Sequence, residues 1–196
     1  MSDRIDQQLS FLIEADKLKS VIRGTTLNDN SRHENSGEHS WHIALYTLVM
    51  AEHATKPVNV DRVIKMLLLH DLVEIDAGDV PIHSDAASDP AAQDAAEQAA
   101  ADRIFGLLPN DQSTALRRLW DEFEAAETDD AIFAKSIDRV QLVVSNLEAG
   151  GASWITYNVT RQQLQTRVGD KVMRGAPAIR NALKSRIDAW FDKPRS

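Results

Sequence analysis

The stretch "LLLHDLVEIDAGD", residues 67–79, ends an apolar run with one imidazole and four carboxylates. These ionisable side chains are His70, Asp71, Glu74, Asp76 and Asp79. A charged group that is buried without a partner costs roughly several kcal/mol or more. Because the leucines predict burial, the stretch indicates a neutralising partner, and a metal cation could serve several carboxylates at once.

The composition fits one globular domain spanning residues 1–196. The chain has 43% hydrophobic and 27% charged residues, which is ordinary for a soluble protein. Its formal net charge of −8 and its pI of about 5.2 predict that no nucleic acid polymer binds across its surface. A small anionic substrate remains compatible with this charge if cationic groups or a metal gather locally.

Three absences narrow the classes of protein further. The chain contains no cysteine, which excludes thiolate zinc sites, disulfides and cysteine nucleophiles. The first residues, "MSDRIDQQLS", lack the pattern of a signal peptide. No apolar run approaches the ~20 residues that span a bilayer. We therefore expect a cytoplasmic protein with no membrane partner.

Helical spacing of apolar residues predicts an all-α fold. A first helix is expected up to about Gly24, followed by a polar loop over 25–37. Asn35 and Glu38 resemble a capping box that opens a helix over 38–54. The next helix covers 60–75, with Asn59 or Asp61 as its cap.

Further helices follow to the end of the chain. One has Asp89 as its cap and Gly106 as its stop, and two more cover 110–127 and 128–149. Thr160 starts a short helix, and the last one covers 177–191. Residues 153–159 are the single segment expected to be extended. The sequence predicts an all-α helical bundle with short connections, in which C-terminal helices over 160–192 pack on the rest of the domain.

Three polar side chains of the opening stretch share one stripe of its helix. His70 and Asp71 point about 100° apart, and Glu74 projects between them one turn later. One helix cannot surround an ion, so other ligands must come from elsewhere. His39 on the second helix and Asp138 in an apolar frame are candidates. Together with His70 and Asp71 they would give a two-nitrogen, two-oxygen set, which suits manganese, cobalt, iron, zinc or magnesium.

Simpler interpretations of these residues exist. A His-Asp pair alone is more often a surface or a satisfied pair, and Asp138 could form an ion pair with Lys135 or Arg139 of its own helix. His53 is fourteen residues after His39, about 21 Å along a helix, so it cannot share the ion. The remaining histidines are weaker candidates for metal ligands. His42 is expected beside the site or in the core, and His33 and His83 are expected in loops.

The motifs "EHSWH" (38–42), "HDLVEIDAGDVP" (70–81) and "DEFEAAETDDAIFAKSIDRVQ" (121–141) resemble the HD-domain phosphohydrolases. The resemblance is strongest to the small bacterial 5′-deoxynucleotidase-like branch and extends from about Leu18 to Trp154. It implies one divalent metal ion, with the ligands His39, His70, Asp71 and Asp138.

The resemblance also implies catalytic and substrate-binding residues. Glu74 matches the glutamate that takes part in proton transfer, and Asp79 matches the aspartate near the attacking water. Arg23 matches an arginine that faces the phosphate or sugar, and Arg32 is a further candidate for anion binding. The chain departs from the family where a tryptophan follows the first arginine, because Gly24 stands there.

These residues predict a metal-dependent phosphohydrolase that acts on a small phosphomonoester, a (deoxy)nucleoside 5′-monophosphate. The resemblance also implies a homodimer. Three alternatives remain: an HD-type nucleotide phosphodiesterase, a dinuclear iron oxygenase on the same scaffold, and a non-catalytic nucleotide-sensing module. The oxygenase would need further histidine ligands, and the sensing module would not need acid–base groups such as Glu74 and Asp79.

Overall fold

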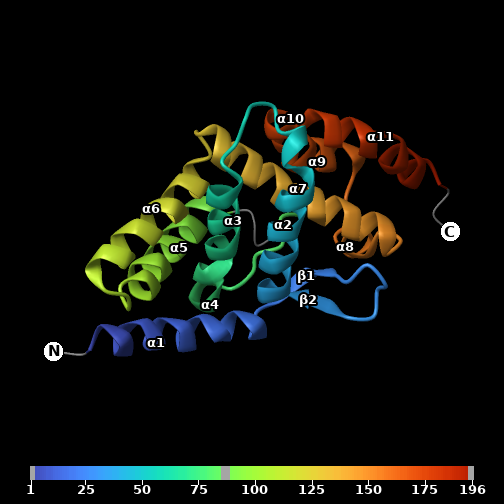
Figure 1. Cartoon of the computed structure of the whole chain (residues 1–196). Coiled ribbons are helices and arrows are strands. Elements are labelled where there is room, and N and C mark those ends of the chain that lie inside the picture. Colours follow the sequence, from blue (N-terminus) through green and yellow to red (C-terminus); the bar gives the residue numbers. More distant parts are fainter. Residues whose placement is uncertain (1–2, 85–88, 194–196) are drawn as a thin grey trace.

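The computed structural model describes residues 3–84 and 89–193, and most of them are helical. Figure 1 shows a bundle in which α2 and α3 lie side by side, with α7 behind them. The longer helices are α1 (Arg4–Ala15), α2 (Ser36–Met50), α3 (Val60–Leu69), α5 (Pro90–Phe105), α6 (Asn110–Ala125), α7 (Asp129–Glu148) and α11 (Pro177–Asp192).

Short elements connect these helices. They are η1 (Asp16–Ser20), β1 (Ile22–Thr26), β2 (His33–Asn35), η2 (Ala51–His53), η3 (His70–Val73), α4 (Glu74–Ala77), α8 (Ala152–Thr156), α9 (Arg161–Leu164), the π-helical η5 (Gln165–Gly169) and α10 (Asp170–Gly175). In the part of the chain that is described, no helix is both long and apolar enough to cross a membrane.

Several helix starts confirm the caps expected from the sequence. Asn35 and Glu38 form the predicted capping box of α2, and the Asn59 side chain accepts a hydrogen bond from Arg62 N at the start of α3. Asp89 and Thr160 cap α5 and α9 in the same way. Each cap satisfies a backbone N–H that has no partner within its own helix.

α7 is the central element of the bundle. It packs against α2, α3, α6 and α10, and its inward faces are almost entirely buried. The largest fully buried side chains of the core include Phe105, Trp120, Phe123, Phe133 and Trp154. Because helices surround α7 on several sides, a polar residue in its middle is forced into the interior and must find a partner there.

The structure corrects the prediction of the first helix. That helix ends at Ala15, and Ile22–Thr26 forms β1, which pairs antiparallel with β2 in a two-stranded sheet. Residues 25–37 are therefore not simply a polar loop. The β-branched residues Ile22, Thr25 and Thr26 favour an extended backbone, and this preference ends the helical pattern after Leu18.

The expectation of an extended segment over 153–159 is wrong. Residues Ala152–Thr156 form α8. The Asn146 side-chain oxygen accepts hydrogen bonds from Trp154 N (3.2 Å) and Ser153 Oγ (2.8 Å), which holds the start of α8 against α7. This contact is tertiary, so local propensity could not reveal it.

The helix predicted over 60–75 is not continuous. It changes at His70 into the 3₁₀ segment η3 and resumes as α4. The carbonyl oxygen of His70 accepts a hydrogen bond from Trp120 Nε1 at 3.1 Å, a contact with α6 at the point where the α-helical pattern is interrupted. The tighter turn changes the directions of His70, Asp71 and Glu74 from those of an ideal α-helix.

Candidate metal centre

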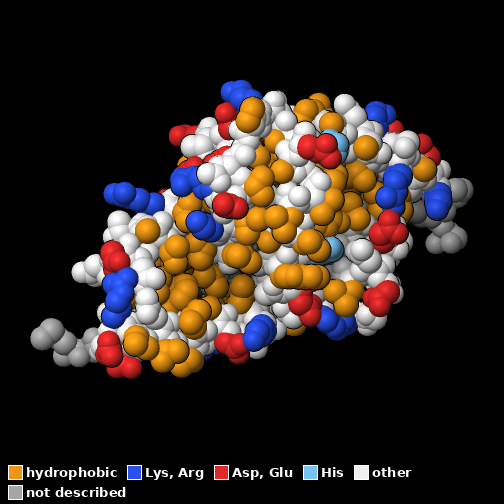
Figure 2. Space-filling view, in the orientation of Figure 1, with side chains coloured by type: hydrophobic (Ala, Val, Ile, Leu, Met, Phe, Trp, Pro, Cys, Tyr) orange, Lys and Arg blue, Asp and Glu red, His pale blue; other side chains and the backbone are white. Residues whose placement is uncertain are grey.

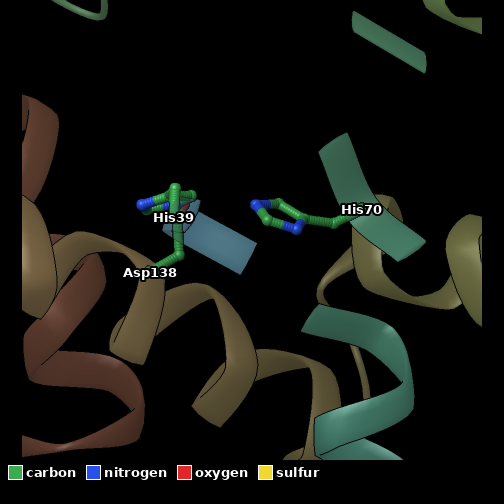
Figure 3. Close-up of side chains that lie close together, drawn as sticks. All are labelled: His39, His70 and Asp138. Atoms are coloured by element: carbon green, nitrogen blue, oxygen red, sulfur yellow. The ribbon is translucent and has the colours of Figure 1, made fainter. Parts of the chain in front are cut away.

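Three buried side chains from distant parts of the chain meet in the core. They are His39 of α2, His70 of η3 and Asp138 of α7, and one possible ligand atom of each lies within 4.8 Å of the others. Figure 3 shows the His70 ring pointing toward His39 and Asp138. Nε2 of His39 lies 3.1 Å from Oδ1 of Asp138. The three helical segments thus bring together three of the four side chains that the sequence predicted as ligands of an ion.

Hydrogen bonds that Nδ1 donates to oxygen atoms orient both imidazole rings. Nδ1 of His39 lies 3.1 Å from Oε1 of Gln141, and the Gln141 amide donates to the buried carboxylate of Glu34. Nδ1 of His70 lies 2.9 Å from the carbonyl oxygen of Leu67. A histidine that ligates a metal usually has its second nitrogen held in this way. Both rings therefore present Nε2 to the cluster.

Asp71 lies at the edge of this cluster. Its Oδ1 is 2.8 Å from Nε2 of His70, and its Oδ2 is 4.0 Å from Nε2 of His39. Among the described residues, Nε2 of His70 is buried without a properly oriented hydrogen bond. A buried nitrogen that faces oxygen atoms in this manner is suited to a shared cation. Two imidazoles with carboxylates fit a divalent ion of the first transition row.

The charged side chains of this cluster shift one another's pKa values. Burial and the charge of Arg23 lower the pKa of His39, but the hydrogen bonds that its ring donates to the carboxylates of Asp138 and Glu34 outweigh them and raise this pKa to about 9. Burial alone would raise the pKa of Asp138, yet Arg139 and His39 hold it well below the usual value. The pKa of Asp71 is likewise lowered, because His70 and Arg23 outweigh its burial. The cluster therefore contains carboxylates that stay ionised in the interior.

Arg23 of β1 joins this cluster to the other predicted catalytic groups. Its Nη1 donates to Oδ2 of Asp71 at 2.6 Å and lies 3.4 Å from Glu74 and 3.7 Å from Asp79. Glu74 also accepts a hydrogen bond from Ser36 Oγ at 2.6 Å. The hairpin that the sequence did not predict is thus the element that carries Arg23 into the site.

The two carboxyl groups beyond the cluster hold protons more tightly than usual. Burial and the charge of Asp71 raise the pKa of Glu74 well above its ordinary value, against the opposing effect of Arg23. Burial also raises the pKa of Asp79, whose Oδ2 accepts a hydrogen bond from Gly24 N at 3.1 Å. Carboxyl groups whose pKa is raised in this way are suited to hold and release protons in catalysis.

A cavity of about 330 Å³ opens beside these residues. Its walls include Arg23, His70, Asp71, Glu74, Asp79 and Asp138, together with Trp154 and Tyr157 of the α8 segment. A Cβ added at Gly24 would lie 2.8 Å from Pro81 Cγ and 3.2 Å from Tyr157 Oη. Pro81 and Tyr157 therefore leave no room at position 24 for a side chain as large as the tryptophan that the resemblance implied there.

The cavity has lining residues that sequence reasoning missed or undervalued. His83, Lys135, Arg139 and Lys171 all face it. Lys135 and Arg139 are four residues apart on α7, and Arg139 directly follows Asp138. Their closeness to a predicted ligand was the feature of the sequence that could have identified them. Lys171 reaches the cavity through the packing of α10 on α7, which the sequence does not encode locally.

The structure does not bring Arg32 to the cluster. Arg32 is exposed and makes two hydrogen bonds to Glu38, at 2.8 and 2.6 Å. Its predicted part in substrate binding stays a prediction.

Three other histidines lie elsewhere in the structure. His42 stacks beside Trp41, Nδ1 of His33 donates a hydrogen bond to the carbonyl oxygen of Arg23, and His53 lies in η2. These three histidines are outside the metal cluster.

Comparison with known proteins gives the family. A model described as an HD domain matches residues 15–180. This chain belongs to the HD-domain family. A crystal structure described as a predicted metal-dependent phosphohydrolase from Magnetospirillum magnetotacticum is 42% identical, with a TM-score of 0.87 over 95% of each chain. A Pyrococcus furiosus protein shares 19% identity at a TM-score of 0.64 and shows the fold alone.

Curated relatives of this HD-domain chain are 5′-deoxynucleotidases. The enzyme HDDC2 of Xenopus laevis is 28% identical over 141 residues, which are 71% of this chain and 68% of the relative. The enzyme hdd1 of Schizosaccharomyces pombe is 23% identical, with 70% of each chain covered. The family and the all-α HD fold predicted from the motifs are confirmed.

Proposed function

We propose that this protein is a metal-dependent phosphohydrolase that releases phosphate from a (deoxy)nucleoside 5′-monophosphate. The observation that carries the proposal is the buried set of His39, His70 and Asp138, of which His70 and Asp138 line a cavity that is also lined by the acid–base groups Glu74 and Asp79. The names of the 42%-identical structure and of the 5′-deoxynucleotidases support the same reaction class.

His39, His70, Asp71 and Asp138 would hold one divalent metal ion: manganese, cobalt, zinc, iron or magnesium. When bound, such an ion lowers the pKa of a coordinated water and neutralises phosphoryl oxygens. Gln141 and the carbonyl oxygen of Leu67 fix the orientation of the two imidazoles. These ligands are therefore already ordered before an ion binds.

Glu74 and Asp79 would move protons during the reaction. Burial and the charge of Asp71 raise the pKa of Glu74 well above its ordinary value, and the Ser36 hydroxyl donates a hydrogen bond to one of its oxygens. Glu74 is thus suited to protonate the leaving oxygen of the nucleoside. Asp79 lies on the same cavity wall and would orient the attacking water. Arg23 keeps the three carboxylates from repelling one another.

A homodimer in the cytoplasm is the second part of the proposal. The outer face of α2 exposes Trp41, Leu45, Leu48 and Val49, an apolar stripe at helical spacing, and Leu68 of α3 is also exposed. Figure 2 shows hydrophobic side chains gathered over the centre of this face. Monomers rarely leave a continuous apolar stripe open to water, so a second copy is the expected cover.

A substrate panel tests the proposed reaction. Nucleoside and deoxynucleoside monophosphates and diphosphates would be assayed with manganese or cobalt for phosphate release, and cyclic dinucleotides for their conversion to linear nucleotides. We expect turnover of the monophosphates. Activity confined to phosphodiesters would instead support the phosphodiesterase and overturn the nucleotidase assignment, and binding of nucleotides without turnover would favour the sensing module.

A further inference from the structure

The cavity beside the metal cluster has two walls of opposite charge. Asp94 and Glu97 line it from α5, whereas Lys135 and Arg139 of α7 and Lys171 of α10 line it from the other helices. An anionic substrate is repelled by the α5 wall. It is therefore directed toward the cations of α7 and α10.

Arg23, the expected partner of the phosphate, is already surrounded by carboxylates. Its guanidinium lies within 3.7 Å of Asp71, Glu74 and Asp79. Lys135 is paired as well, because its ammonium donates to Glu124 at 2.9 Å and lies over the Phe123 ring. The charges of these two cations are largely compensated within the protein.

Arg139 is in a different situation. Its side chain is only 18% exposed, and its Nε is buried without a hydrogen-bond partner among the described residues. Its nearest ion-pair partner is Oδ2 of Asp138, at 3.6 Å, which is beyond hydrogen-bond distance. Once Asp138 shares its charge with a metal ion, this weak pairing no longer compensates the guanidinium.

Lys171 of α10 adds a second cation to the lining of the same cavity. It makes no hydrogen bond or ion pair with any described side chain through its ammonium, and desolvation followed by the charges of Arg139 and Lys135 lowers its pKa. Burial, Arg167 and Arg139 likewise lower the pKa of His83 to about 4. Lys135, Arg139 and Lys171 thus place three cationic side chains around one cavity, an arrangement that suits an anion between them.

We propose that Arg139, assisted by Lys171, binds the phosphoryl oxygens of the substrate on the side of the metal cluster away from Arg23. The proposal rests on the proposed phosphohydrolase function and extends it. It assigns anion recognition to α7 and α10, with Arg139 as the substrate-contacting residue. Arginine suits this position because its planar fork matches a phosphate with two parallel hydrogen bonds.

Inorganic phosphate is the probe for this site. Its affinity for the manganese-loaded protein would be measured by calorimetry for the wild type, Arg139→Gln, Arg139→Lys and Lys171→Gln, with metal content and melting temperature recorded for each. We expect the dissociation constant to rise about 10- to 100-fold in Arg139→Gln, as for a lost charge-assisted hydrogen bond. Arg139→Lys should recover part of this loss, and Lys171→Gln should weaken binding by a smaller factor.

Arg186→Gln is the matched control, because Arg186 is an exposed arginine of α11 that pairs with Glu148. It should leave phosphate affinity unchanged. Unchanged affinity in both Arg139→Gln and Lys171→Gln, with metal retained, would overturn the proposal even if the wild type hydrolyses monophosphates. Weakened phosphate binding in a protein without phosphatase activity would keep the anion site and reject the proposed function.

Discussion

At the scale of single residues, Glu74 and Asp71 differ in the role that their surroundings permit. Asp71 lies 2.8 Å from Nε2 of His70, whereas Glu74 is held by Ser36 and Arg23 farther along the same segment. Asp71 is therefore placed as a ligand and Glu74 as a proton donor. Substituting each by its amide separates these roles, because the amide keeps the shape and removes the ionisable group.

Glu74→Gln should keep the metal and lose a factor on the order of 10²–10⁴ in kcat. Asp71→Asn should lose metal affinity, and stability with it, because the ligand charge and the partner of Arg23 disappear together. Metal content, melting temperature and kcat would be measured side by side. Loss of the metal from Glu74→Gln as complete as that from Asp71→Asn would make Glu74 a ligand and reject its assigned role.

At the scale of elements, the turn between α7 and α8 depends on two adjacent glycines with positive φ. Gly150 has φ +71° with nothing within 4 Å of an added Cβ, whereas Gly151 has φ +102° and a Cβ there would overlap the Trp190 ring. α8 carries Trp154 and Tyr157 to the cavity, so the geometry of this turn shapes the site.

Alanine at the two glycines should have unequal effects on the free energy of unfolding. Gly150→Ala should cost about 1–2 kcal/mol from backbone strain alone. Gly151→Ala carries comparable strain and should cost about 1–3 kcal/mol more, because the Trp190 ring must move. Denaturant unfolding of both variants measures the difference. Equal losses would show that the ring does not restrict this position.

The elements also show what the sequence could predict. Caps and helical spacing located α2, α3, α5 and α7, because local side-chain chemistry decides where such helices begin. The hairpin β1–β2 and the helix α8 escaped prediction, since pairing with His33–Asn35 and the Asn146 contacts are tertiary. The motifs that resemble the HD domain sufficed to predict that His39, His70 and Asp138 lie together, whereas the place of Lys171 in the cavity lining depends on how α10 packs on α7.

The boundaries of the domain, with a motif core over 18–154 and C-terminal helices over 160–192, stay a prediction. Within the described residues, α10 packs closely on α7, and Lys171 lines the same cavity as Asp138. The C-terminal helices are therefore expected to contribute to function as well as to packing. This inference follows from contacts between elements that are distant in the sequence.

At the scale of the whole molecule, the apolar stripe on α2 predicts the oligomeric state. Trp41 is 63% exposed and Leu48 is 62% exposed. Trp41→Glu and Leu48→Glu should convert the proposed dimer into a monomer, because a buried glutamate without a partner opposes association. Light scattering after size-exclusion chromatography measures the mass.

Ile155→Glu on α8 is the control for these substitutions, since Ile155 is similarly exposed but lies outside the stripe. It should leave the mass unchanged. A wild-type protein that remains monomeric at high concentration would contradict the predicted dimer, while the account of the metal cluster would be unaffected.

The central claim is that the cluster of His39, His70 and Asp138 is a metal site that serves phosphate release. Elemental analysis of the purified protein, paired with an assay of nucleoside monophosphate hydrolysis before and after chelation, tests it most directly. The account predicts up to one equivalent of a divalent metal per chain, loss of hydrolysis on chelation, and recovery when manganese or cobalt is restored. Two irons per chain would point to an oxygenase, and hydrolysis that persists in metal-free protein would contradict the claim.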